Sequence, residues 1–205
     1  MSTTKAARTR LTPAERSTQI QDAALAIARE EGLSALTLRA VARRAGVASG
    51  LITHYEPSID ELVARTFTAI TAAELTELRA LVHDLPSPTA RLRVLIRALL
   101  AEARDDVTLA WVESSALGRR NPALATAVRE QMNEWMHFIS ELVTAGIADQ
   151  SFASTEPVDT AWQLIGMIDG LNAQALLRRT DAELFVTQMA RASEAILGAK
   201  RGSLG

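Results

Sequence analysis

The sequence predicts an all-α protein of about nine helices. Three observations support this fold class. Ala and Leu are abundant, and no segment alternates apolar and polar residues with the two-residue period of a strand. Proline falls at the starts of segments, where the first turn of a helix tolerates it. Apolar residues recur at helical spacing through most of the chain.

Composition narrows the class of protein further. The 205 residues are enough for one domain or two small ones, and 48% hydrophobic with 22% charged residues is ordinary for a soluble protein with a core. The absence of cysteine excludes disulfides, thiolate zinc sites and cysteine nucleophiles. No apolar signal core follows the basic N-terminus, and no apolar run is long enough to span a bilayer. We therefore expect a cytoplasmic protein with no membrane partner.

The first helix has a clear start and end. Thr12, Pro13 and Glu15 form the pattern of a capping box, with the proline at the first helical position. Gly32 is expected to end this helix, since glycine tolerates the backbone conformation that follows a helix. Residues 1–11, which precede it, are interpreted as a flexible basic arm.

Capping residues divide the rest of the chain in the same way. The second capping box, at Ser58, opens a long helix that should reach about His83. Further helix starts are expected at residues 87–90, 121–124 and 180–183. Residues 58–199 then form one helical body, and residues 200–205 form a tail.

Residues 38–57 have the pattern of a helix-turn-helix. Gly46 is the pivot of the turn, and the small Ala42 precedes it by four positions, where two steeply crossing helices would touch. The apolar positions of the pattern are occupied by Val41, Ala45, Val47, Ile52 and Tyr55. A generic helical hairpin is the alternative. We interpret residues 12–57 as a three-helix, helix-turn-helix DNA-binding domain.

The second helix of such a unit enters the DNA major groove with its N-terminal side chains at base edges. Those side chains are Ser49, Gly50, Leu51, Thr53 and His54. Thr37 and Arg39 should face phosphates, and Arg43 and Arg44 should lie near the DNA backbone or bind carboxylates. Residues 1–46 carry a net charge of +4 within a chain of net charge −2, so the basic front end is expected to meet an anion.

Residues 33–63 resemble the DNA-binding domain of the TetR family of bacterial transcriptional regulators. The similarity is carried by LSALTLRAVARRAGVASGLITHYEPSIDELV, and GLITHY is closest to the BetI-type branch. It continues in the body, in LAWVESSALGRRNPALATAVREQM, ELVTAGIADQSF and LIGMIDGLNAQALL. The resemblance implies a double-stranded DNA operator, a C-terminal helical ligand-binding and dimerisation domain, and pairing of the last two helices in a homodimer. It also adds Ala48 and Tyr55 to the DNA-binding residues.

Three positions depart from the family pattern. The family usually has Ser at Ala48, an aromatic residue at Glu56 and Lys at Ile59. Because a buried unpaired carboxylate is costly, Glu56 should be exposed or paired, with Arg43, Arg44 or the basic arm as partner. The gained carboxylate and lost cation support a rival interpretation, a helical dimeric ligand-binding module with weak or lost operator binding. In the arm, Lys5, Arg8 and Arg10 offer compensating contacts with DNA.

The body is expected to hold a small-molecule inducer that is mostly apolar. All three tryptophans lie there, and in the family the corresponding helices surround the ligand. The candidate ligand-binding residues are Phe67, Trp111, Ser114, Met132, Trp135, Trp162, Asp169 and Asn172. Ordinary core packing is the alternative for each aromatic residue. Aromatic rings with a carboxylate would also make a cage for a choline-like cation.

Two apolar stripes near the end of the chain predict the dimer contact. One runs along residues 158–176 and the other along 184–197, as expected for helices that pack on a partner pair. The predicted dimer residues are Trp162, Ile168, Leu171, Phe185, Met189 and Ile196. Packing within one subunit explains part of each stripe.

Enzyme function is disfavoured. The three histidines are scattered, without metal-ligand spacing, and no nucleophile elbow or phosphate-binding glycine loop occurs. No cofactor and no metal are expected. The sequence therefore favours a sequence-specific DNA-binding transcriptional regulator, a repressor released from a pseudo-palindromic operator by its inducer.

Overall fold

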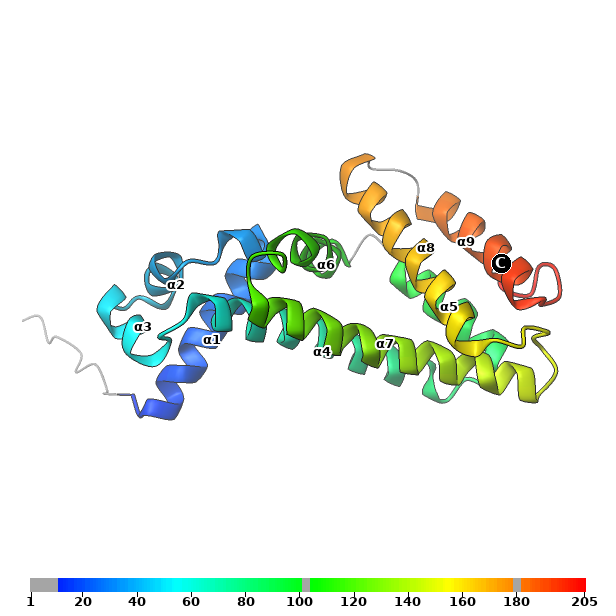
Figure 1. The fold of residues 1–205 in the computed structure, drawn as a ribbon, viewed down its shortest axis with the longest axis horizontal. Helices are drawn as coiled ribbons and strands as arrows, with labels where there is room; N and C mark the ends of the chain where they lie inside the picture. The colour runs from blue at the N-terminus through cyan, green and yellow to red at the C-terminus, as the bar shows by residue number, and fades with distance from the viewer. Residues whose placement is uncertain (1–10, 101–103, 179–181) are drawn as a thin grey trace, which may run out of the picture.

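The computed structural model describes residues 11–100, 104–178 and 182–205, and these ranges are all-helical (Figure 1). They contain nine α-helices and one short 3-10 helix. The elements are α1 (Pro13–Glu31), η1 (Leu33–Ala35), α2 (Leu38–Ala45), α3 (Ser49–Tyr55), α4 (Ile59–His83), α5 (Pro88–Leu99), α6 (Asp105–Leu117), α7 (Pro122–Ala148), α8 (Pro157–Arg178) and α9 (Ala182–Leu197). The predicted fold class is confirmed.

The molecule is elongated. Helices α1 to α3 form one end, and α8 and α9 form part of the other end (Figure 1). The two longest helices, α4 and α7, pack against each other along the middle. Helix α6 lies between the two ends and contacts α1, η1, α4, α7 and α8. Together with α4, it joins the N-terminal helices to the C-terminal ones.

Turn chemistry fixes the helix boundaries as the sequence predicts. The Thr12 capping box is complete, with the Thr12 amide donating to Glu15 Oε2 at 2.7 Å. Gly32 ends α1 at a φ of 89°, and Gly46 ends α2 in the left-handed region at a φ of 67°. Ser58 caps α4 by accepting from the Glu61 amide. The box predicted at 180–183 begins at Thr180, which lies outside the described residues.

Two hydrophobic cores follow one another along the molecule. The first joins α1 to α3 with the first half of α4, with α6 and with the start of α7. The second is built from the second half of α4 and from α5, α7, α8 and α9. The boundary predicted between residues 57 and 58 therefore crosses a continuous core, which couples the N-terminal helices to the body.

The final residues are packed against α9. Leu204 is fully buried, and the Glu194 carboxylate accepts backbone hydrogen bonds from Gly202 at 2.9 Å and Leu204 at 2.8 Å. The segment expected as a tail thus closes the end of the C-terminal core. None of the helices in the described ranges has the length and apolar character needed to cross a membrane.

Candidate DNA-binding surface and ligand pocket

Helices α2 and α3 form a helix-turn-helix around buried apolar contacts. Val41, Ala42 and Ile52 are at most 2% exposed, and the Gly46 amide donates to the carbonyl of Arg43 at 3.2 Å. The opposite face of α3 is open to solvent. Its exposed residues are Ser49, Gly50, Thr53 and His54, preceded by the exposed Ala48.

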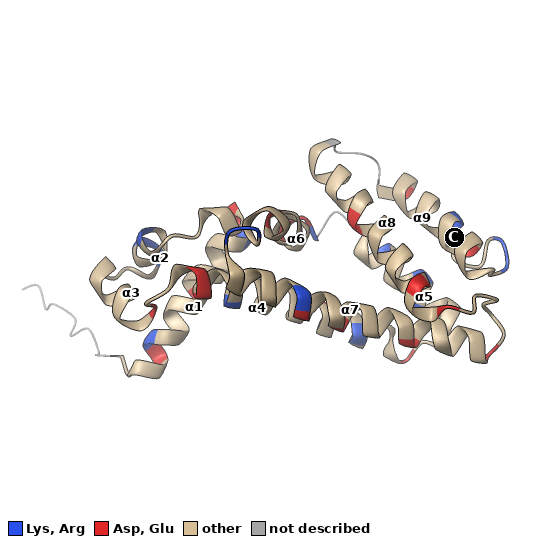
Figure 2. Ribbon diagram, viewed as in Figure 1, with Lys and Arg blue, Asp and Glu red and all other residues tan. Residues whose placement is uncertain are grey.

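Two of the predicted DNA-binding residues on α3 are only partly open to solvent. Leu51 and Tyr55 are half-buried, and the Tyr55 ring meets the His54 ring edge-on at 5.2 Å between centroids. Helix α3 carries no Lys or Arg (Figure 2). Any base contact from α3 must therefore come from hydroxyl, imidazole, apolar or backbone groups. The arginine or lysine side chains that pair with DNA phosphates must come from other elements.

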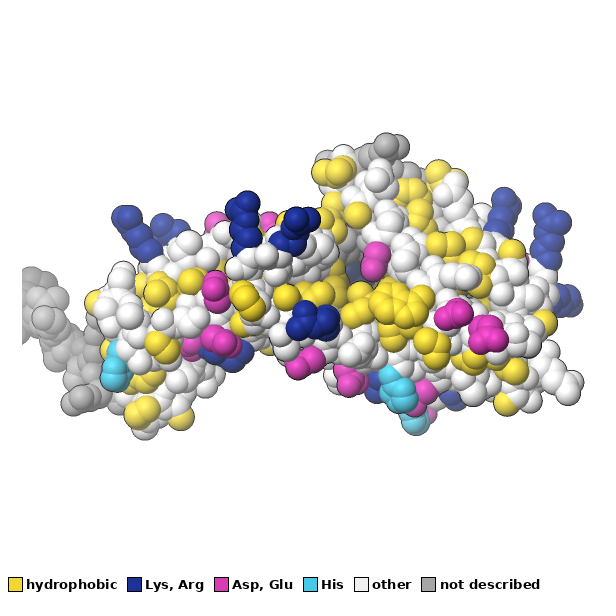
Figure 3. Space-filling view, in the orientation of Figure 1, with side chains coloured by type: hydrophobic (Ala, Val, Ile, Leu, Met, Phe, Trp, Pro, Cys, Tyr) yellow, Lys and Arg dark blue, Asp and Glu magenta, His cyan; other side chains and the backbone are white. Residues whose placement is uncertain are grey.

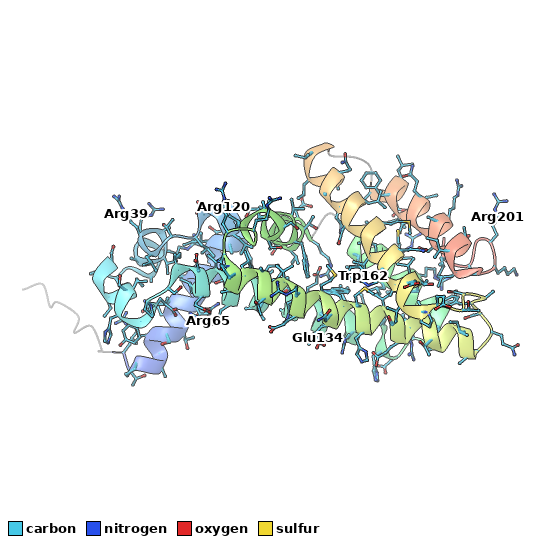
Figure 4. The ribbon with its side chains drawn as sticks, viewed as in Figure 1. Arg39, Arg65, Arg120, Glu134, Trp162 and Arg201 are labelled. Carbon is cyan, nitrogen blue, oxygen red and sulfur yellow. The ribbon has the colours of Figure 1, made fainter. Side chains whose placement is uncertain are left out.

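Helix α2 supplies cations beside α3. Thr37 caps α2 by accepting from the Ala40 amide at 3.0 Å, and Arg39 and Arg43 are exposed. Arg39 extends away from the protein (Figure 4). Arg44 instead binds the Glu30 carboxylate on α1, with Nη1 2.7 Å from Oε2. Arg44 was predicted either to lie near the DNA backbone or to bind a carboxylate. The structure shows carboxylate binding, which links α2 to α1.

Glu56 is buried and paired at the corner between α3 and α4. It is 8% exposed and accepts from the guanidinium of Arg65 on α4. The predicted pairing is confirmed, but the partner is Arg65 and not Arg43 or Arg44, and the basic arm lies outside the described residues. Ile59 is half-buried and packs against the N-terminal core. Glu56 is therefore neutralised within the protein.

The body encloses a cavity of about 450 Å³ between α4, α5, α6, α7 and α8. Five predicted ligand residues line it: Trp111, Met132, Trp135, Asp169 and Asn172. A hollow with apolar walls is visible between α6 and α8 (Figure 3). The volume falls within the range of about 300–1,000 Å³ that is usual for small-molecule pockets.

Three predicted ligand residues do not line this cavity. Phe67 is fully buried in the N-terminal core, where its ring meets that of Trp111 edge-on at 5.0 Å. Ser114 is buried and donates to the Trp111 carbonyl at 2.7 Å. Trp162 is 52% exposed on α8 (Figure 4). Residue type and helix assignment suggested these positions. Phe67 lies two turns before the lining residue Glu74, and Trp162 lies one turn before the lining residue Ile165, so their position along the helix keeps them out of the cavity. Ser114 is instead turned to another face of α6.

The cavity also holds a carboxylate that the sequence-based interpretation missed. Glu74 is 7% exposed, and burial raises its pKa to about 7, although the Arg104 charge and a hydrogen bond from Trp111 oppose that rise. A signal was present in the sequence. Ile70, Glu74 and Leu78 are spaced four apart on one face of α4, so Glu74 had to share the buried face.

Two further polar groups give the cavity its chemistry. The Asp169 side chain is reached by solvent, yet the surrounding protein desolvates the carboxylate and raises its pKa to about 6. The Trp135 indole N–H is buried and has no hydrogen-bond partner among the described residues. The pocket thus combines tryptophan rings, two carboxyl groups and a free donor within mostly apolar walls.

The predicted dimer residues divide into two groups. Trp162 is exposed, and Leu171, Phe185 and Ile196 are half-buried. Ile168 and Met189 are only 6% and 1% exposed, so we correct their assignment to the core of one subunit. Further large apolar side chains are exposed near this face: Val158 and Leu177 on α8 and Leu184 on α9. Apolar side chains gather over this end of the molecule in Figure 3.

Metal ligands do not cluster in the described residues. No group of three or more His, Asp or Glu side chains there is arranged to hold a metal ion. His83 contacts Asp84 at 2.7 Å and His137 contacts Glu141 at 3.1 Å, both at the surface.

Comparison with known proteins assigns the fold and the DNA-binding unit. Residues 20–66 match the family model of bacterial regulatory proteins of the tetR family. Residues 88–198, more than half of the chain, match the model of the BetI-type transcriptional repressor C-terminal domain. This chain belongs to the TetR family. It is accordingly a DNA-binding transcriptional regulator with a BetI-type C-terminal domain, and not an enzyme.

Individual relatives of this TetR-family chain are distant. It is 28% identical over 165 residues to the HTH-type transcriptional regulator BetI of Escherichia coli O45:K1, covering 78% of this chain and 81% of that protein. A putative TetR-family regulator from Rhodococcus sp. superposes with a TM-score of 0.75 at 20% identity, covering 90% and 99% of the two chains. A putative regulator from Saccharomonospora viridis, solved with choline, gives 0.76 at 18% identity, covering 86% and 94%.

Proposed function

We propose that this TetR-family regulator is a repressor that a cationic small molecule releases from a two-fold symmetric DNA site. The observation that carries the proposal is the position of α6. One face of α6 contributes Trp111 and Val112 to the cavity, and other residues of the same helix hold the N-terminal helices. A ligand in the cavity therefore touches the element that positions the DNA-binding unit.

The proposed DNA contacts combine base and backbone recognition. Thr53 and His54 are exposed on α3 and would reach base edges, while Arg39 and Arg43 on α2 would meet phosphates. The basic arm, outside the described residues, would add sequence-independent contacts. This division of roles makes Thr53 and His54 the residues for sequence preference.

The cavity chemistry favours an amphiphile with one cationic group. Glu74 and Asp169 supply carboxyl groups whose charged form a bound cation would stabilise, and Trp111 and Trp135 supply ring faces that attract cations. This refines the expectation of a mostly apolar inducer. The choline in the Saccharomonospora viridis regulator supports a cation, but choline is small for a cavity of about 450 Å³. We propose a ligand with a quaternary or protonated amine and a larger apolar part.

A homodimer completes the proposal. Two copies joined through α8 and α9 would cover the exposed Trp162 and Leu184 and present two equivalent recognition helices. Half-site spacing near one helical turn of DNA would follow from that symmetry. Phe185 and Ile196, half-buried on α9, remain proposed contributors, as does the half-buried Leu171, which lies on the opposite side of α8 from Trp162.

The proposal is tested by selecting bound sequences from random DNA and measuring ligand effects on the selected site. We expect a two-fold symmetric sequence whose affinity falls when a cationic amphiphile is added. Thr53→Ala and His54→Ala should reduce discrimination by about 1–3 kcal/mol per lost base contact. Recovery of no preferred sequence would favour the rival, a dimeric ligand-binding module with weak or lost operator binding.

A further inference from the structure

Glu74 lines two cavities at once. It forms part of the wall of the apolar cavity beside Trp111 and Trp135. It also borders a smaller cavity of about 200 Å³ whose other charged residues are Arg29, Glu77, Arg104 and Asp106. A charge placed at Glu74 from the ligand side therefore acts directly on this second, charged cluster.

Arg104 holds Glu74 loosely. Its Nη1 lies 3.7 Å from Glu74 Oε1, beyond hydrogen-bond distance, whereas its Nη2 donates to Glu77 Oε1 at 2.8 Å. The Arg104 side chain is only 15% exposed, so these carboxylates compensate its largely buried charge. If another cation pairs with the Glu74 carboxylate, Arg104 still has the Glu77 carboxylate as its partner.

Arg104 stands at the start of the helix that holds the DNA-binding unit. It occupies the N-cap position of α6, and two residues later Asp106 accepts from Arg29 on α1 at 3.1 Å. Two turns along α6, Glu113 accepts from the Ser34 amide at 3.1 Å and from its hydroxyl at 2.6 Å. A change at Arg104 is thus two residues from Asp106, whose bond to Arg29 attaches α6 to α1.

We propose that a cationic ligand competes with Arg104 for Glu74, and that this exchange transmits ligand binding to the DNA-binding domain through Asp106 and Arg29. The inference rests on the proposed function and adds to it the residues that detect the charge of the ligand. A ligand shifts a conformational equilibrium only through unequal affinity for the two states. The exchange would give the ligand unequal affinity for the two states, because Glu74 cannot pair fully with Arg104 and the ligand cation at the same time.

Head-group charge gives the first test. Decyltrimethylammonium and decan-1-ol share an apolar chain, but only the first carries a cation. Both are titrated into the protein by tryptophan fluorescence, and DNA affinity is measured with and without each at saturation. Both should enter the apolar cavity. The cation should weaken DNA binding by about 5–150-fold, the usual range for coupled sites, and the alcohol should leave it within about twofold. Equal release by both compounds would overturn the exchange.

Substitution at Arg104 gives the second test. In Arg104→Gln the cation should still bind, but its effect on DNA affinity should drop to within about threefold. Arg97→Gln is the matched control, because Arg97 is a half-exposed arginine on α5 paired with Glu183 and lies outside the cluster. It should retain the full effect. An undiminished effect in Arg104→Gln would also overturn the exchange.

A third variant guards against misfolding of Arg104→Gln. Arg29 is 49% exposed and does not line the ligand cavity, so Arg29→Gln should fold, bind the cation normally and lose most of the coupling. Retention of full coupling in Arg29→Gln would exclude the proposed route through Asp106. If the cation does not bind the wild-type protein, the proposed ligand class fails as well. If it binds and releases DNA in every variant, only the exchange fails.

Discussion

At the scale of single residues, burial gives the Glu74 carboxyl group a pKa near neutrality. Its pKa in the folded protein is about 7, against an ordinary value of 4.5, because burial disfavours the charged form. The folded state therefore binds more protons than the unfolded state between these two values. The stability that Glu74 contributes is present below pH 4.5 and is lost as the pH rises through 7.

Glu74→Gln should remove the loss of folding stability that the wild-type protein shows as the pH rises through 7. The variant should match the wild-type free energy of unfolding near pH 5 and exceed it by about 1–3 kcal/mol at pH 8, since the buried charge is gone. Urea denaturation at the two pH values measures the difference. A gap between variant and wild type that does not change with pH would show that Glu74 is not titrating in this window.

The Glu56–Arg65 pair makes an asymmetric prediction. Glu56 is 8% exposed, whereas the Arg65 side chain is 48% exposed. Arg65→Met leaves a buried carboxylate without its partner and should cost about 2 kcal/mol or more of stability, while Glu56→Gln should cost about 1 kcal/mol. Urea denaturation compares them. Equal losses of stability in the two variants would contradict the pairing. Tighter DNA binding by Glu56→Gln would instead place this carboxylate beside the phosphates.

At the scale of elements, turn chemistry was predictable and side-chain pairing was not. Thr12, Gly32 and Gly46 set helix ends through backbone conformations and hydrogen bonds within a few residues. The sequence therefore places these helix ends correctly. Glu56 and Arg65 meet across nine residues, and Arg104 meets Glu74 across two helices. Such pairs depend on how each helix is rotated. Phe67 and Trp162 miss the cavity for another reason: each lies one or two turns before the lining residues on the same face of its helix.

The recognition helix offers a prediction at this scale. Ala48 occupies the N-cap of α3 and makes no side-chain capping bond, whereas Thr37 caps α2. Ala48→Ser should stabilise the protein by about 0.5–1 kcal/mol, and Thr37→Ala should destabilise it by a similar amount. Thermal denaturation of both variants provides the measurement. Loss of stability in Ala48→Ser would mean that the start of α3 cannot accept the cap.

At the scale of the whole molecule, the exposed apolar face of α8 and α9 predicts the assembly. Trp162→Glu together with Leu184→Glu should convert the proposed dimer to a monomer, because both side chains are exposed in one subunit and would become buried charges in the proposed interface. Sedimentation velocity gives the mass. Leu81→Glu, on an exposed part of α4, is the matched control and should stay dimeric. A double variant that still sediments as a dimer would move the interface elsewhere.

Ligand-controlled DNA release is the central claim, and one binding measurement tests it most directly. Labelled DNA from beside this protein's own gene is titrated with protein at one salt concentration, with and without decyltrimethylammonium at a level that saturates the tryptophan fluorescence change. We predict specific binding that weakens by about 5–150-fold when the cavity is occupied. Unchanged DNA affinity with the cavity demonstrably occupied would contradict the account.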